Sequence, residues 1–186
     1  MLEENIRKTE EAVHKAFPNE KWHDAAALKL KNKGEEFEIP PGVKNIYAAH
    51  SRLTGKKEDE RTLVKEIMQG KILADMGGVI FLLPKLRAPD GKYIKGPDAV
   101  VNGELFEFKN ITGSIKRVER NFRKSRYQSE NVFLVIADPA ISKDDVLAKI
   151  KTVLNDPLYK GGTKGHLVFH LSQTERTYFM RIKNLK

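Results

Sequence analysis

The chain has 186 residues, of which 40% are hydrophobic, and a formal net charge of +9. This length accommodates one domain with a substantial core. No apolar run approaches the ~20 residues of a membrane span, and the lack of cysteine excludes disulfides and thiolate metal sites. The excess of positive charge favours a polyanionic partner such as nucleic acid.

The first part of the chain is expected to be a helical segment, residues 1–55, followed by a second domain over residues 56–186. An amphipathic helix is predicted over residues 2–17, which lack the apolar core of a signal peptide. A second helix is predicted over residues 22–30. Residues 34–45 are expected to be irregular or a short edge strand, because two prolines and a glycine interrupt them.

Clearer patterns follow from Glu58 onward. Apolar and small residues at helical spacing predict a helix over residues 58–76, which ends at two glycines. The apolar run of residues 79–84 predicts a strand covered on both faces. Asn102-Gly103 between two alternating runs predicts a β-hairpin with a two-residue turn.

Helices and strands are also expected after the hairpin. An amphipathic helix is predicted over residues 115–128, and Ser142 is expected to cap a helix over residues 143–155. Strands are predicted over residues 131–138, 166–172 and 177–183. The antiparallel hairpin and the helical crossover together predict an α/β fold with helices packed on a mixed sheet.

The predicted hairpin brings like charges together. Counted outward from the turn, Asp98 lies opposite Glu107, and two opposed carboxylates should destabilise the pair. Lys109 points to the same face as Glu107 because strand side chains alternate. A divalent cation shared by the two carboxylates would convert their repulsion into coordination, so Mg²⁺ or Mn²⁺ is the expected cofactor.

These residues carry a family resemblance. Pro97-Asp98 followed by Glu107 and Lys109 resembles the PD-(D/E)XK nuclease superfamily, and the expected element order from Glu58 to Ala137 is similar to its αβββαβ core. The resemblance implies that Asp98 and Glu107 bind the metal and that Lys109 positions the attacking water. A glutamate of the preceding helix, for which Glu66 is the best match, would support the metal.

Within that superfamily, residues 73–136 look most like the C-terminal tRNA-nuclease domains of CdiA-type contact-dependent inhibition toxins. This resemblance implies a role for Gln128, on the helix after the Glu-x-Lys strand. It also implies a tRNA substrate, a cognate immunity protein, and delivery into a target cell with action in the bacterial cytoplasm.

The helix expected over residues 115–128 is the predicted nucleic-acid contact. Its six cations face a single acid, Glu119, and are suited to binding phosphates. They are Lys116, Arg117, Arg120, Arg123, Lys124 and Arg126. The alternative is an ordinary solvated helix face.

Other interpretations stay open at this point. Glu107 and Lys109 could form a solvated strand face, and Glu58, Glu60 or Asp75 could replace Glu66. His166 and His170 could serve a metal-free ribonuclease as general acid and base. For the whole chain, a tRNA-cleaving toxin domain is the main hypothesis. The alternatives are a DNA endonuclease of the same superfamily and a non-catalytic basic nucleic-acid-binding module.

Overall fold

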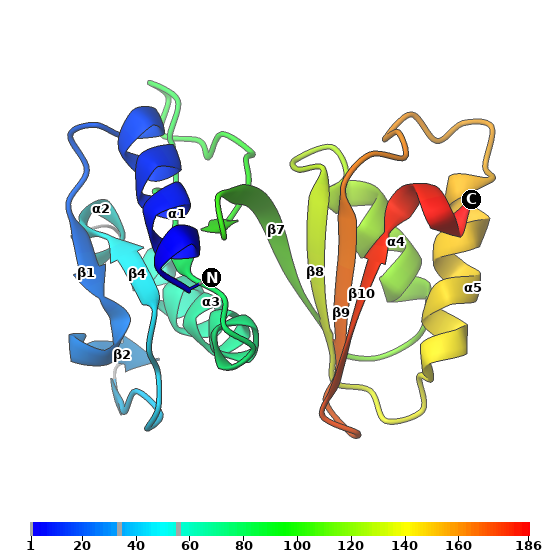
Figure 1. Cartoon of the computed structure of the whole chain (residues 1–186), viewed down its shortest axis with the longest axis horizontal. Coiled ribbons are helices and arrows are strands. Elements are labelled where there is room, and N and C mark those ends of the chain that lie inside the picture. The colour runs from blue at the N-terminus through cyan, green and yellow to red at the C-terminus, as the bar shows by residue number, and fades with distance from the viewer. Residues whose placement is uncertain (1, 33–34, 55–56) are drawn as a thin grey trace. The chain divides into compact units, whose positions relative to one another are not determined.

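Helices and strands alternate along the computed structural model, which describes residues 2–32, 35–54 and 57–186 (Figure 1). The chain divides into two units, one ending at Leu105 and the other formed by Phe106–Lys186. Both units combine strands with helices, so the predicted mixed α/β class is confirmed.

The first unit is built from short strands and three helices in its described part. The helices are α1 (Leu2–Ala16), α2 (His50–Leu53) and α3 (Lys57–Asp75). The strands are β1 (Trp22–Asp24), β2 (Leu30–Asn32), β3 (Glu35–Phe37), β4 (Ile46–Ala49), β5 (Ile80–Leu82) and β6 (Ala99–Val101). β1 pairs antiparallel with β4, β4 parallel with β5, and β5 antiparallel with β6, while β2 and β3 form a separate antiparallel pair.

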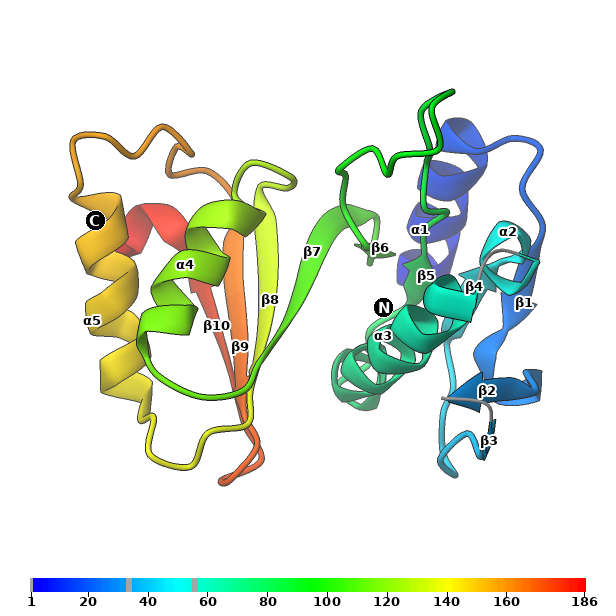
Figure 2. The same cartoon turned by 180° about the vertical axis from the view of Figure 1, so that it is seen from behind.

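Strand β5 is covered on both faces, as its continuous apolar sequence predicts. Phe81 belongs to a buried cluster with Val13 of α1, whereas Ile80 points the other way, toward Gly70 of α3. Figures 1 and 2 show α1 and α3 on opposite faces of these strands. Gly70 faces the side chains of Ile46 and Ile80, so α3 packs on β4 and β5 at this point.

The predicted helix over residues 22–30 is wrong. Trp22 begins strand β1, whose pairing with β4 outweighs the helix propensity of the following alanines. Asp24 accepts a hydrogen bond from the Ala26 backbone N–H at 3.0 Å and caps a single 3₁₀ turn, η1 (Ala25–Ala27), which ends at Leu28, where the backbone is extended. The predicted boundary between residues 55 and 56 falls outside the described residues.

The turn predicted at Asn102-Gly103 is confirmed. Both residues have positive φ, 50° and 87°, as the two-residue hairpin turn requires. The Asn102 side-chain oxygen accepts a hydrogen bond from the Val79 N–H at 2.9 Å, and the Asn102 backbone N–H donates to the Val79 carbonyl at 3.0 Å. The opposition of Asp98 and Glu107 joins residues of different units and stays a prediction.

The second unit is a layer of strands with helices on one face (Figure 2). Its strands are β7 (Glu104–Ile111, entering from the first unit), β8 (Asn131–Ile136), β9 (His166–Leu171) and β10 (Arg176–Arg181). Its helices are α4 (Lys116–Ser125), α5 (Lys143–Leu154) and the 3₁₀ turn η2 (Ile182–Leu185). β7, β8 and β9 run parallel, and β10 pairs antiparallel with β9. Val118 and Phe122 of α4 and Ile150 of α5 are buried in one cluster with the strand residues.

Local sequence signals also fix the ends of elements here. Ser142 caps α5 in a reciprocal capping box with Asp145, as its position predicts. The order α3, β5, β6, β7, α4, β8 agrees with the order expected from residue 58 onward. In the described part of the chain, no helix combines the length and apolar character needed to cross a membrane.

Candidate functional site

Two acids of the first unit converge on one lysine. Glu66 lies on the face of α3 that packs on the strands, and Asp98 directly precedes β6; they are 4% and 6% exposed. The Lys85 ammonium lies 3.1 Å from Glu66 Oε1 and also forms an ion pair with Asp98 Oδ1. The structure therefore brings together Glu66 and Asp98, both predicted as site residues, through a residue that the sequence analysis did not name.

Arg52 completes this cluster. Its side chain is 1% exposed, and its Nη1 donates to Glu66 Oε2 at 2.8 Å and to the Leu83 carbonyl at 3.0 Å. Each oxygen of Glu66 thus contacts a different cation. The two acids and two bases balance in charge, which makes their burial tolerable.

Burial and neighbouring charges act in opposite directions on these groups. Burial raises the pKa of the Glu66 carboxyl, and the Arg52 guanidinium is the largest opposing influence. Burial alone would lower the pKa of Lys85, but the Glu66 and Asp98 carboxylates outweigh it and raise that pKa. Lys85 is therefore a protonated ammonium at neutral pH.

The other acids considered as replacements for Glu66 are placed differently. Asp75 is exposed and forms an ion pair with Lys71 at 2.6 Å. The side chains of Glu58 and Glu60 lie outside the described residues. Glu66 is thus the α3 acid that shares a partner with Asp98 among the side chains described.

In the second unit, the side chains of Lys109 and Gln128 both contact Glu107. Glu107 is 1% exposed in the middle of β7. Lys109, two residues farther on the same face, forms an ion pair with Glu107 Oε1 and donates to the Phe108 carbonyl at 3.2 Å. The Gln128 side chain, just after α4, donates to Glu107 Oε1 at 2.7 Å. These three residues were predicted as site residues from their spacing and resemblance, and the fold groups them.

The six cations predicted to contact nucleic acid, on α4 and just after it, differ in their exposure to solvent. Lys116, Arg120 and Lys124 are exposed at a spacing of four residues, so they form one stripe along the helix. None of them takes part in an ion pair within the part of the chain that the structure describes. Arg117 is also exposed and donates to the Thr112 carbonyl at 2.6 Å. We call Lys116, Arg120 and Lys124 the basic stripe.

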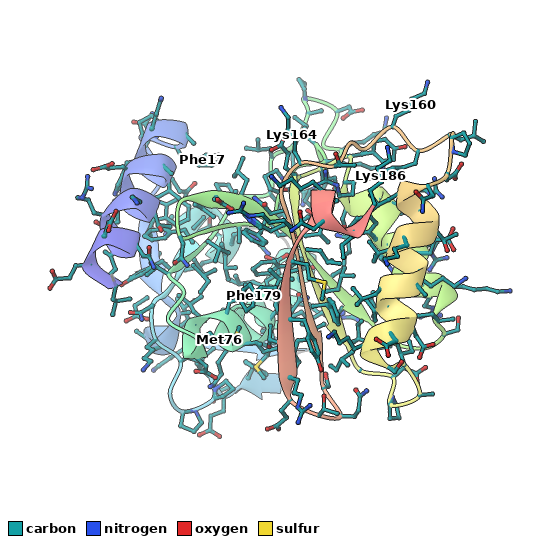
Figure 3. The ribbon with its side chains drawn as sticks, turned by 45° about the vertical axis from the view of Figure 1, so that its right-hand side comes forward. Phe17, Met76, Lys160, Lys164, Phe179 and Lys186 are labelled. Carbon is teal, nitrogen blue, oxygen red and sulfur yellow. The ribbon has the colours of Figure 1, made fainter. Side chains whose placement is uncertain are left out.

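The two remaining cations of this region have internal partners. Arg123 forms ion pairs with Asp156 at 2.7 Å and with Glu119 at 3.7 Å. Arg126 is 7% exposed and donates to the backbone carbonyls of Gly161 and Lys164 at 3.0 and 2.8 Å. Burial of Arg126 does not fit direct phosphate contact. It instead holds the loop before β9, on which Lys160 and Lys164 are exposed (Figure 3).

The surroundings of His170 give little support to the alternative of a metal-free ribonuclease that uses histidines as general acid and base. His170 Nδ1 lies 2.9 Å from the Thr177 hydroxyl of the neighbouring strand. Burial lowers the pKa of His170, with a weaker opposing effect of Glu175. A histidine engaged with a neighbouring strand and biased toward the neutral form is a poor general acid.

Two buried carboxylates of the first unit could serve as ligands of a divalent cation. No group of three or more His, Asp or Glu side chains that could hold a metal ion occurs among the described residues. Glu66 and Asp98 nevertheless already direct one oxygen each at a cation, the Lys85 ammonium. Carboxylate oxygens are the ligands that Mg²⁺ and Mn²⁺ prefer.

Fold and site together describe a basic mixed α/β protein with two buried acid–lysine clusters. Residues 95–174 match the family model described as the contact-dependent growth inhibition CdiA C-terminal domain. This match runs from the residues before β6 to the turn after β9 and supports a CdiA C-terminal toxin domain. No curated protein and no solved structure matches the chain.

Proposed function

We propose that the chain is a metal-dependent nuclease of PD-(D/E)XK type, acting as the tRNA-cleaving toxin domain of a contact-dependent inhibition system. The observation that carries the proposal is the buried Glu107 carboxylate with Lys109 and Gln128 on it. The match of residues 95–174 supports the toxin part, and CdiA C-terminal toxin domains are commonly nucleases.

Asp98, Glu107 and Glu66 would hold Mg²⁺ or Mn²⁺. A cation bound there would lower the pKa of a water molecule and stabilise the charge that develops on the phosphate. Lys109 would align the water for in-line attack, because its ammonium already lies against a carboxylate of the site. Gln128 would hold the Glu107 carboxylate in one orientation through its amide N–H.

The basic stripe would bind the phosphate backbone. Lys116, Arg120 and Lys124 repel one another at four-residue spacing, and Lys116 also lies unfavourably at the positive N-terminal end of α4. This arrangement costs helix stability, so a polyanionic ligand that relieves the repulsion is its most direct physical explanation. Selection of tRNA over DNA rests on the toxin resemblance.

A toxin of this kind would also have a protein partner. The CdiA match implies a cognate immunity protein that protects the producing cell. The toxin domain would be delivered into the target cell and would act on nucleic acid in its cytoplasm.

Cleavage assays with matched variants test the proposal. The purified protein with Mg²⁺ or Mn²⁺ is expected to degrade total tRNA, and Glu107→Gln should abolish cleavage while circular dichroism stays unchanged. Glu104→Gln is the matched control, because it makes the same charge change at an exposed position of β7. Cleavage of plasmid DNA but not tRNA would favour the DNA endonuclease, and cleavage of neither would refute the nuclease proposal.

A further inference from the structure

The cation between Glu66 and Asp98 belongs to the chain itself. Lys85 lies in the connection between β5 and β6, and its ammonium contacts Glu66 Oε1 and Asp98 Oδ1. These are two of the oxygen atoms that a divalent cation would need. An ammonium and a metal ion cannot both occupy the space between the same two oxygens, because metal–oxygen distances are only about 2.0–2.6 Å.

Arg52 and Lys85 differ in how firmly they are held. Arg52 is 1% exposed and is also fixed to the Leu83 carbonyl through a planar guanidinium. The Lys85 side chain is 22% exposed and ends in a compact ammonium on a flexible stem. Lys85 is therefore the cation of this cluster that can leave.

The structure also provides room for that movement. Lys85 lines a pocket of about 210 Å³, together with Phe17, Leu86, Ile94 and Lys95. The pocket walls are mostly apolar and suit the aliphatic stem of a lysine. With its stem against these walls, the Lys85 ammonium can reach water instead of the two acids.

We propose that Lys85 is a built-in counter-cation that occupies the Glu66–Asp98 site when metal is absent and is displaced when a divalent cation binds. This inference rests on the proposed metal dependence and adds a residue that opposes metal binding. In the absence of metal Lys85 keeps the buried acids neutralised. With metal bound, its ammonium moves out of the cluster, and Arg52 stays on Glu66.

The expected effect on affinity follows from this competition. If the ammonium occupies the acid pair about 90% of the time, the site is competent about 10% of the time, and the apparent Kd is raised about tenfold. Lys85→Gln removes the competitor, so calorimetric titration with Mn²⁺ should show about tenfold tighter binding. Lys85→Arg keeps a competing charge and should not bind more tightly than the wild type.

Lys95→Gln is the matched control. Lys95 lines the same pocket, is exposed, and loses the same charge, so its substitution should leave the Mn²⁺ affinity within about twofold of wild type. Equal affinities of Lys85→Gln and Lys95→Gln would overturn the inference and leave the proposed metal dependence intact. If neither the wild type nor Lys85→Gln binds Mn²⁺, the metal dependence itself fails, and the inference fails with it.

A second measurement uses the wild-type protein and does not depend on the folding of a variant. An amine-acylating reagent followed by mass spectrometry should label Lys85 slowly without metal and at least several times faster with saturating Mn²⁺. Lys95 should be labelled equally in both conditions. Protection of Lys85 that persists in the Mn²⁺-bound protein would overturn the displacement.

Discussion

Replacement of Arg52 by methionine is expected to destabilise the first unit strongly. The variant removes a cation that is 1% exposed and 2.8 Å from a carboxylate that is itself 4% exposed. Removal of one partner of a buried ion pair costs about 3–5 kcal/mol, because the remaining charge is buried without compensation. Lys85 still contacts Glu66 at 3.1 Å, so the lower end, about 3 kcal/mol, is expected.

The assay can be restricted to this unit. Trp22 is the single tryptophan of the chain, and its ring packs edge-on against Phe81 at 5.1 Å between centroids. Tryptophan fluorescence in a urea titration therefore reports the loss of structure around Trp22 and Phe81 in the first unit. The titration is done with a chelator, so that metal binding does not alter the free energy of unfolding.

Two further variants distinguish loss of the Arg52–Glu66 ion pair from a nonspecific effect of replacing an arginine. Arg61→Met removes an exposed arginine of α3 and should change the free energy of unfolding by less than about 0.5 kcal/mol. The double variant Arg52→Met with Glu66→Gln removes both charges, and should be about 2 kcal/mol more stable than the sum of the single losses. A loss below about 1 kcal/mol for Arg52→Met, or additive losses in the cycle, would refute the buried pair.

Three other outcomes follow from the second unit. Replacing Arg120 and Lys124 together by alanine should weaken substrate binding. It should also reduce the slope of log K against log salt by about 1.4–1.8, because each lost phosphate contact contributes about 0.7–0.9. An unchanged slope would show that the basic stripe does not face the ligand. Ser142→Ala should cost about 1 kcal/mol of stability, measured by circular dichroism, because it removes the cap of α5; an unchanged midpoint would contradict that role. His170 favours its neutral form in the fold, so its contribution to stability is present above the unfolded pKa of about 6.5 and is lost as the pH falls below it. His170→Gln should flatten that part of the stability–pH curve, and an unaltered curve would exclude His170 as the cause.

Local patterns were sufficient to predict the elements around the site. Helix α3, the turn at Asn102-Gly103 and the capped helix α5 each depend on residues close in sequence, and each is present. The helix expected over residues 22–30 failed for the opposite reason. Its three alanines favour helix locally, whereas the pairing of β1 with β4 is a contact between segments far apart in the chain.

Part of the candidate site was predictable because it follows strand periodicity. Glu107 and Lys109 are two residues apart on one strand, so their shared face could be derived without the structure. Gln128 came from the resemblance alone, and its hydrogen bond to Glu107 depends on how the chain returns after α4. Arg52 could not be found in this way, because it meets Glu66 and Leu83 only after α2 packs beside α3 and β4.

Lys85 was not predicted as a site residue, although its place in the sequence after β5 indicates that it lies near Asp98. The antiparallel pairing of β5 with β6 brings the Leu83 N–H to the Asp98 carbonyl at 2.9 Å. The connection that follows β5 therefore runs beside the start of β6, and Lys85 lies on it two residues beyond Leu83. The sequence-based prediction paired Asp98 only with Glu107 across the Asn-Gly turn, where two like charges require a cation from outside the chain. The connection after the other neighbouring strand, β5, supplies a cation from the chain itself, so the acids can be buried before any metal binds.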